Sequence, residues 1–203
     1  GCGTGASSML LAEELDAEIV AVDFLPDFLD KLKSRAKVRG VADRIRTLEA
    51  SMDDLPFSHG EFDVIWSEGA VYNMGFEAGV SYWKRFIKPG GVLVVSEITW
   101  LGSSRPAEIT AHWESEYPEI GLASEKFAAL ERCGYRPEAY FVLPENGWLD
   151  NYYRPLQARF DAFLDRHGQS EAARATVDAE RSEIALYEKY REHYSYGVYI
   201  AFA

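Results

Sequence analysis

The sequence lacks several features that would place the protein in particular classes. No run of about 18 apolar residues occurs, which excludes a hydrophobic membrane span. Two cysteines, Cys2 and Cys133, are too few for a disulfide framework or a cysteine zinc site. The four histidines show no metal-ligand spacing such as H-E-x-x-H, so we predict no metal. A reducing, cytoplasmic environment is the expectation for such a chain.

Basic residues are also scarce relative to acidic ones. The chain has 21 Lys and Arg against 33 Asp and Glu, which gives a formal net charge of −12. A surface this acidic repels phosphate backbones and anionic lipid, so we expect neither nucleic acid nor a membrane as partner. The hydrophobic fraction of 47% in 203 residues is instead that of a folded domain with a substantial core.

Short apolar runs alternate with helical patterns through the first half of the chain. The predicted strands cover 18–23, 45–48, 62–67 and 92–98, and the predicted helices cover 6–15, 26–37 and 76–88. Pro89, Gly90 and Gly91 are expected to end the third helix. This alternation predicts right-handed βαβ units, and therefore a doubly wound α/β fold with a mostly parallel sheet covered on both faces.

The second half of the chain is mainly helical. Helices are predicted at 105–117, 124–133, 149–166 and 170–194, with strands at 139–142 and 197–202. We expect one domain over 1–203, a final strand that is antiparallel, and a helical insertion before it. Residues 101–122 and 144–196 are expected to cover the substrate side. The apolar stripe of the last helix would also offer an alternative surface for a homodimer.

A glycine cluster, Gly1-Cys2-Gly3-Thr4-Gly5, precedes the first predicted helix. Alternate glycines let the backbone approach a ligand closely, and the helix N-terminus offers free N–H groups. Asp23 lies 22 positions after Gly1 at the end of the next predicted strand, where a carboxylate can accept both hydroxyls of an adenosine ribose. Because such a loop normally follows a buried strand, we expect a central strand before Gly1 in a longer protein.

The glycines alone leave two cofactors open. Read as G-x-G-x-x-A, with Ala6 last, the loop fits a nicotinamide or flavin dinucleotide; read as G-x-G-x-G, it fits S-adenosylmethionine. Three further segments favour the second interpretation: ASMDDLPF at 50–57, FDVIWS at 62–67, and KPGG at 88–91 before VLVV. Together the four segments resemble the class I S-adenosylmethionine-dependent methyltransferases over about residues 1–100. The stretch 57–95 is most similar to the small-molecule branch that includes ubiquinone and menaquinone methylases.

The resemblance implies S-adenosylmethionine as cofactor and a small molecule as methyl acceptor. Asp23 would bind the ribose, Phe24 or Leu25 would pack on adenine, and the N–H of Met52 would bind it. Many relatives carry an acid where this chain has Ser51, so Asp53 is an alternative acceptor for the adenine amine. The cofactor-binding residues implied are Gly1, Cys2, Gly3, Thr4, Gly5, Asp23, Phe24, Leu25, Ser51, Met52, Asp53 and Ser67.

Methyl transfer asks little of the protein beyond alignment and exclusion of water, and a general base is needed only if the acceptor loses a proton. Candidates for this role follow the strands at 62–67 and 92–98, since open α/β sheets bind ligands at the carboxyl ends of their strands. They are Glu68, Tyr72, Asn73 and Glu97. For either acid, a carboxylate bonded to backbone N–H groups is the structural alternative.

Two other functions are consistent with these residues. A nicotinamide-dependent oxidoreductase uses a similar sheet, and a non-catalytic protein could keep the cofactor site for binding alone. The aromatic residues of the second half are expected mainly in the core, with an aromatic wall over the acceptor as the alternative; they are Trp113, Tyr117, Trp148, Tyr152 and Tyr153. His112 is expected to be a surface or helix-capping residue, with a general base as the less favoured alternative.

Overall fold

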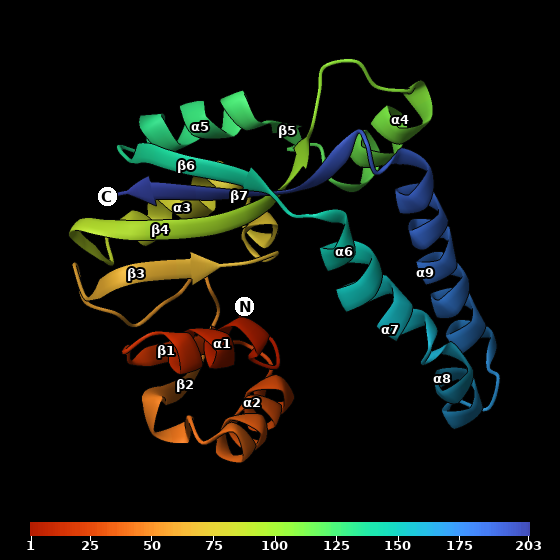
Figure 1. The fold of residues 1–203 in the computed structure, drawn as a ribbon, viewed down its shortest axis with the longest axis horizontal. Coiled ribbons are helices and arrows are strands. Elements are labelled where there is room, and N and C mark those ends of the chain that lie inside the picture. The colour runs from red at the N-terminus through yellow and green to blue at the C-terminus, as the bar shows by residue number, and fades with distance from the viewer. The chain divides into compact units, whose positions relative to one another are not determined.

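The strands form two sheets in the computed structural model, which describes residues 1–203 (Figure 1). In the first sheet, β1 (Ile19–Asp23) pairs in parallel with β2 (Ile45–Glu49). The second has the order β3-β4-β7-β6, with β5 also paired to β4. Its strands are β3 (Phe62–Ser67), β4 (Ile87–Trp100), β5 (Gly121–Leu122), β6 (Arg136–Val142) and β7 (Tyr194–Phe202). Both β3 and β5 are parallel to β4.

The last strand runs antiparallel to β4. The N–H of Gly90 donates to the carbonyl of Ala203, and the N–H of Leu101 donates to the carbonyl of His193. Residue numbers on the two strands therefore run in opposite directions, as predicted. Together with the parallel pairs, this confirms the predicted α/β fold with a mostly parallel sheet.

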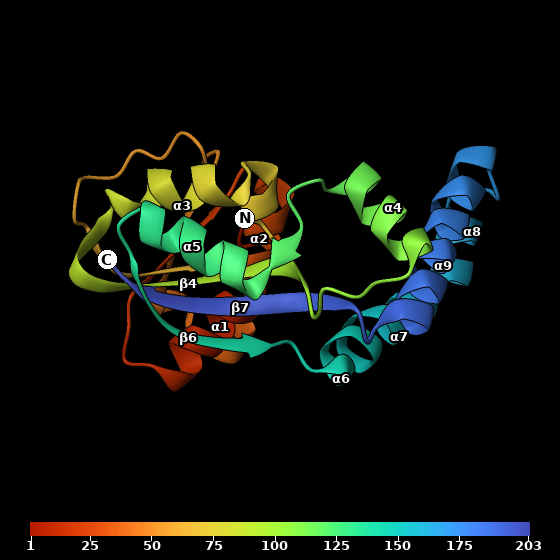
Figure 2. The same cartoon turned by 90° about the horizontal axis from the view of Figure 1, so that it is seen from above.

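Helices connect the strands. In Figure 2, α3 and α5 lie along one face of the second sheet. No helix combines the length and the apolarity that a membrane span requires. The helices are α1 (Ala6–Glu14), α2 (Pro26–Arg39), α3 (Phe76–Lys84), α4 (Ala107–Glu116), α5 (Ala123–Arg132), α6 (Glu145–Trp148), α7 (Arg154–Gln157), α8 (Phe160–Arg166) and α9 (Glu171–Tyr190), with short turns η1 (Ala42–Arg44), η2 (Val71–Asn73) and η3 (Leu149–Tyr153).

The chain divides into two units. Unit 1 contains Gly1–Glu97, Ala129–Ala139 and Tyr199–Ala203; unit 2 contains Ile98–Ala128 and Tyr140–Val198. The strands β4, β6 and β7 each pass from one unit into the other. All the predicted cofactor and catalytic residues belong to unit 1.

A small apolar cluster holds the first sheet to its helices in unit 1. Pro26 stands at the first position of α2, where its fixed φ suits a helix start, and Gly40 ends the helix in the left-handed conformation. The buried cluster places α1 and α2 against β1; its members are Met9, Ala12, Ala21, Leu32, Ala36 and Val41.

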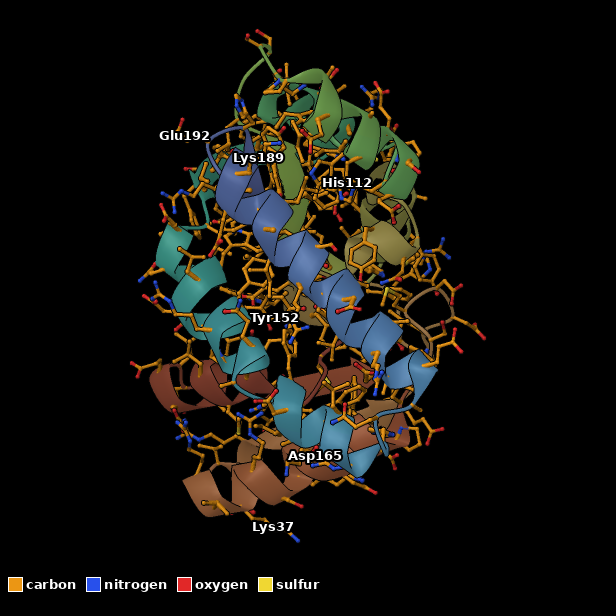
Figure 3. All side chains as sticks on the ribbon, turned by 90° about the vertical axis from the view of Figure 1, so that its right-hand side faces the viewer. Lys37, His112, Tyr152, Asp165, Lys189 and Glu192 are labelled. Carbon is orange, nitrogen blue, oxygen red and sulfur yellow. The ribbon has the colours of Figure 1, made fainter.

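Aromatic side chains build the core of unit 2. The Trp148 ring stacks on Tyr187 with centroids 4.7 Å apart and on Tyr153 at 5.7 Å. Both tyrosines are buried, so the expectation of a core role is correct for Trp148 and Tyr153, whereas Tyr152 is half exposed. The long helix α9 carries Lys189 near its C-terminal end (Figure 3). Its buried side chains are Ala173, Val177, Ile184, Tyr187 and Tyr190.

Several predicted boundaries were wrong. The helix α3 ends at Lys84 rather than Lys88, because the N–H of Phe62 donates to the carbonyl of Phe86 and Ile87 already pairs with Phe62. The strand β4 consequently starts five residues before the predicted Val92. The predicted helix 149–166 is divided into η3, α7 and α8, and α9 ends at Tyr190 because Tyr194 already belongs to β7.

Candidate active site

The glycine loop turns sharply between the chain start and α1. Gly3 and Gly5 have φ values of 55° and 81°, in the left-handed region that side chains disfavour. A Cβ on Gly5 would lie 2.0 Å from Cδ1 of the buried Leu32, so this position requires glycine on two grounds. A Cβ on Gly3 would meet no atom within 4 Å, so the space over Gly3 is open.

Asp23 clamps this loop at the end of β1. Its Oδ2 accepts the N–H of Gly3 at 2.8 Å, and its Oδ1 accepts the N–H of Leu25 at 3.0 Å. The carboxylate is only 5% exposed. Since each carboxylate oxygen can accept more than one hydrogen bond, the clamp leaves acceptor capacity for a ligand's hydroxyls.

Two other loop residues are also fixed by the surrounding structure. Arg35 on α2 donates through Nη1 to the carbonyl and to Oγ1 of Thr4, both at 2.9 Å. The N–H of Cys2 donates to the carbonyl of Val22 at 2.8 Å. Burial raises the pKa of the Cys2 thiol to about 11, so at neutral pH it is a protonated packing group and not a nucleophile.

The segment 51–55 is held by α3. Trp83, which is 4% exposed, donates its indole N–H to the carbonyl of Met52 at 3.0 Å. The N–H of Leu55 donates to the Tyr82 hydroxyl at 3.0 Å. The N–H of Met52 makes no hydrogen bond within the chain and is left for a ligand.

The loop, this segment and the turn after β3 converge. A Cβ on Gly1 would lie 3.0 Å from Cβ of Ala70 and 3.2 Å from Cε of Met52. Beside Asp23, Phe24 is 63% exposed and Leu25 is 37% exposed, so apolar surface is available for a flat ring. These features fit an adenosyl group joined to an amino acid: the open space above Gly3, the free N–H of Met52, the carboxylate of Asp23 and the exposed apolar side chains beside it.

Glu68 is tied into unit 1 by both of its oxygens. Oε2 accepts the hydroxyl of Ser7 in the first turn of α1 at 2.5 Å, and Oε1 accepts the indole N–H of Trp66 at 2.8 Å. The partners are thus side chains, not the backbone groups of the structural alternative. These bonds link the turn after β3 to the helix that follows the glycine loop.

The other predicted residues differ in accessibility. Glu97 is fully buried in β4, whereas Tyr72 is 45% exposed. Asn73 is exposed and donates to the carbonyl of Ala70 at 3.0 Å, within the turn η2. Ser51 and Asp53 are exposed, and Ser67 at the end of β3 is half-buried.

Sequence reasoning missed the residues that bond to the glycine loop, to the segment 51–55 and to Glu68: Arg35, Tyr82, Trp83 and Ser7. Their bonding partners are between 27 and 61 residues away along the chain, so no local pattern indicates them. The one available signal for Tyr82 and Trp83 on α3 is chemical: a buried phenol or indole N–H needs a hydrogen-bond partner, although the sequence does not say which one.

His112 lies on α4 in unit 2, as Figure 3 shows. Its ring contacts the neighbouring Trp113 edge-on, with centroids 5.3 Å apart. It is half-buried rather than at the open surface. Within the chain, no three His, Cys, Asp or Glu side chains group so as to hold a metal ion.

Comparison with known proteins identifies this arrangement. Residues 1–91 match the family described as "Methyltransferase domain". Erythromycin 3''-O-methyltransferase of Saccharopolyspora erythraea is 32% identical over 177 residues, covering 77% of this chain and 56% of the relative. Demethylmenaquinone methyltransferase of Thermus thermophilus is 36% identical over 97 residues, covering 47% of this chain and 43% of the relative. The chain thus spans about half the length of these two relatives.

A solved structure gives the same fold. The S-adenosylmethionine-dependent methyltransferase from Geobacter sulfurreducens, in complex with S-adenosyl-L-homocysteine, superposes with a TM-score of 0.85. It is 22% identical, and the match covers 99% of this chain and 81% of that one. Residues 1–91 thus match a methyltransferase domain, and the relatives named above are methyltransferases, as the four sequence segments predicted. The nicotinamide-dependent oxidoreductase left open by the glycine spacing is not supported.

Proposed function

We propose that the protein transfers a methyl group from S-adenosylmethionine to a small-molecule acceptor. The observation that carries the proposal is the carboxylate of Asp23, buried and clamped between the N–H groups of Gly3 and Leu25. It lies beside the open space above Gly3 and the exposed side chains of Phe24 and Leu25, within the residues that match a methyltransferase domain.

The residues of the loop would hold the cofactor through its nucleoside and amino-acid parts. When bound, S-adenosylmethionine supplies a methyl carbon that its sulfonium already activates. Asp23 would accept the ribose hydroxyls, Phe24 would cover one face of adenine, and Met52 would donate its N–H to the adenine ring. Gly3 would let the backbone approach the methionine part without a side chain between them.

The acceptor side needs alignment and, for a protonated acceptor, a base. Glu97 is the candidate base, since a carboxylate shielded from water can take the acceptor's proton without competition from solvent. Glu68 is the second candidate, because Ser7 and Trp66 each donate to one of its oxygens and fix the carboxylate while leaving it further acceptor capacity. Tyr72 and Asn73, both solvent-accessible on η2, would contact the acceptor.

The partners follow from charge. The net charge of −12 favours a neutral or cationic small acceptor over nucleic acid or an anionic membrane. Residues 101–122 and 144–196 would cover the acceptor, and the cytoplasm would be the compartment. A homodimer would use another surface than the apolar stripe of α9, because that stripe is buried in the core of unit 2.

Asp23→Asn tests the cofactor assignment. The amide keeps the size of the carboxylate but replaces one acceptor oxygen with a donor, so it opposes the N–H groups and the ribose hydroxyls. We expect S-adenosylhomocysteine to bind about 10- to 100-fold more weakly by calorimetry, which corresponds to about 1–3 kcal/mol. Asp43→Asn, an equal charge change at an exposed site in η1, should leave the affinity unchanged.

The same titration against NADH separates the cofactors. Binding of NADH without S-adenosylhomocysteine would reject the proposal. Binding of S-adenosylhomocysteine without methylation of any acceptor in a broad panel would leave a cofactor-binding protein and reject the enzymatic part.

A further inference from the structure

A cavity of about 280 Å³ opens within unit 2. It lies where the parallel strands β4 and β5 end, because Trp100 of β4 pairs with Leu122 of β5 and both line the cavity. Carboxyl ends of parallel strands are where α/β sheets bind ligands. The lining residues are Trp100, Ser103, Arg105, Thr110, Glu114, Pro118, Ile120, Leu122 and Glu125.

Arg105 brings an unused donor to this cavity. Its guanidinium stacks over the buried Trp100 ring at 4.6 Å, and its Nη1 donates to the carbonyl of Gly102 at 2.9 Å. These contacts orient the side chain. Its Nε–H is buried and has no hydrogen-bond partner in the chain. A buried donor without a partner costs free energy, and an acceptor oxygen on a ligand would remove that cost.

Two carboxylates face the same space. Glu125 is partly engaged, since its Oε2 accepts the N–H of Leu122 at 2.6 Å, whereas Glu114 on α4 is exposed and makes no ion pair. With Arg105 the lining carries one positive and two negative charges, so a carboxylate or phosphate on the ligand would be repelled by the two acids. An ammonium would be attracted by the two acids, but it would face the guanidinium charge and would offer no acceptor to the Arg105 Nε–H.

The remaining lining adds hydroxyl groups and carbon. Thr110 donates its hydroxyl to the carbonyl of Pro106 at 3.0 Å and so keeps its oxygen as an acceptor. Ile120, Leu122 and Pro118 offer apolar contact. At about 30 Å³ per water molecule, the volume holds roughly nine waters, the size of one six-membered ring with substituents.

We propose that this cavity binds a neutral, hydroxylated ring of the sugar type. A ligand hydroxyl can accept the hydrogen bond that the Arg105 Nε–H lacks, and it can donate one to the carboxylate of Glu114 or Glu125. The ring carbons would pack on the apolar lining residues.

Three probes with one ring test the charge preference. Methyl glucoside, methyl glucuronide and methyl glucosaminide are neutral, anionic and cationic at pH 6.5, and saturation-transfer NMR measures their affinities. We expect millimolar binding of the neutral probe and at least fivefold weaker binding of the other two. Arg105→Leu should weaken the neutral probe at least fivefold.

Glu114→Gln is the decisive variant, because the side chain is exposed and its removal does not disturb the fold. It should weaken the binding of the neutral probe, because a hydrogen-bond acceptor is lost. It should raise the affinity for the glucuronide severalfold, because one repelling charge is gone. Glu116→Gln is the matched control: it removes the same charge from α4 two residues away, outside the lining, and should change neither.

No binding of the neutral probe, tighter binding of the glucuronide to the unaltered protein, or equal effects of the two glutamine variants would each overturn the assignment. Calorimetry with S-adenosylhomocysteine on the same sample separates the two proposals. If that compound binds and the glucoside does not, only the cavity assignment fails. If only the glucoside binds, the cofactor proposal fails and the cavity assignment stands.

Discussion

Gly5 combines a backbone requirement with a packing requirement. Its φ of 81° alone would cost an alanine about 1–2 kcal/mol. The clash of a Cβ with Leu32, a fully buried core residue, adds a cost that Leu32 cannot relieve without moving the cluster around it. The glycine loop is therefore part of the core of unit 1, and ligand binding and folding share this residue.

Gly5→Ala should lower the free energy of unfolding by roughly 2–5 kcal/mol, the sum of left-handed strain and overpacking. Gly40→Ala is the control, because Gly40 has a φ of 73° with nothing within 4 Å of a Cβ. It should cost about 1–2 kcal/mol from strain alone. Urea denaturation measures both, and equal losses would mean that packing against Leu32 contributes nothing.

At the scale of elements, apolar runs predicted β1 and β3 closely, because the sequence of a buried strand is rich in β-branched and aromatic residues, whereas β4, β6 and β7 start earlier than predicted and β5 was not predicted. The strand β3 was predicted with its observed ends, and β1 within one residue. The end of α3 was not predictable, because pairing of Ile87 with Phe62 across the sheet overrides the helical pattern. The glycine loop and Asp23 could be found from spacing, but the bonds that α3 makes to the segment 51–55 join distant parts of the chain.

Trp83→Phe tests how far α3 positions that segment. Loss of the indole N–H frees the carbonyl of Met52, and we expect S-adenosylhomocysteine to bind about fivefold more weakly, equivalent to about 1 kcal/mol. Tyr135→Phe is the matched control, because its hydroxyl donates to the carbonyl of Val80 on the same helix, away from the segment. Both variants should be less stable, but only Trp83→Phe should lose affinity in calorimetry; parallel losses would show that α3 acts through general stability.

At the scale of the whole molecule, the two units were not predictable from the sequence. Three strands pass from one unit into the other without a linker, so no change in composition marks the boundary. The chemistry of the units differs: the glycine loop, Asp23 and the candidate acids belong to unit 1, whereas the aromatic core and the polar cavity belong to unit 2. Each should therefore respond differently to ligands and to pH.

Alkaline pH should destabilise unit 2 through its buried tyrosines. Burial raises the pKa of Tyr187 to about 12 and the pKa values of Tyr153 and Tyr194 well above the ordinary value of 10. Below pH 10 these phenols are protonated whether the chain is folded or unfolded, so stability there does not depend on them. Above pH 10 the unfolded chain releases their protons and the folded unit does not, so stability falls as pH rises, by up to about 1.4 kcal/mol per pH unit for each tyrosine.

Tyr187→Phe isolates one of these groups. Its unfolding free energy should parallel that of the unaltered protein from pH 7 to 9 and then fall less steeply between pH 10 and 12, because one ionisable phenol has been removed from the unfolded chain. Urea titrations followed by tryptophan fluorescence measure both proteins, and Trp148, which stacks on Tyr187, is one of the five tryptophans that contribute to the signal. Identical slopes above pH 10 would mean that the Tyr187 phenol ionises as readily in the folded unit as in the unfolded chain, and that the stacked core admits water.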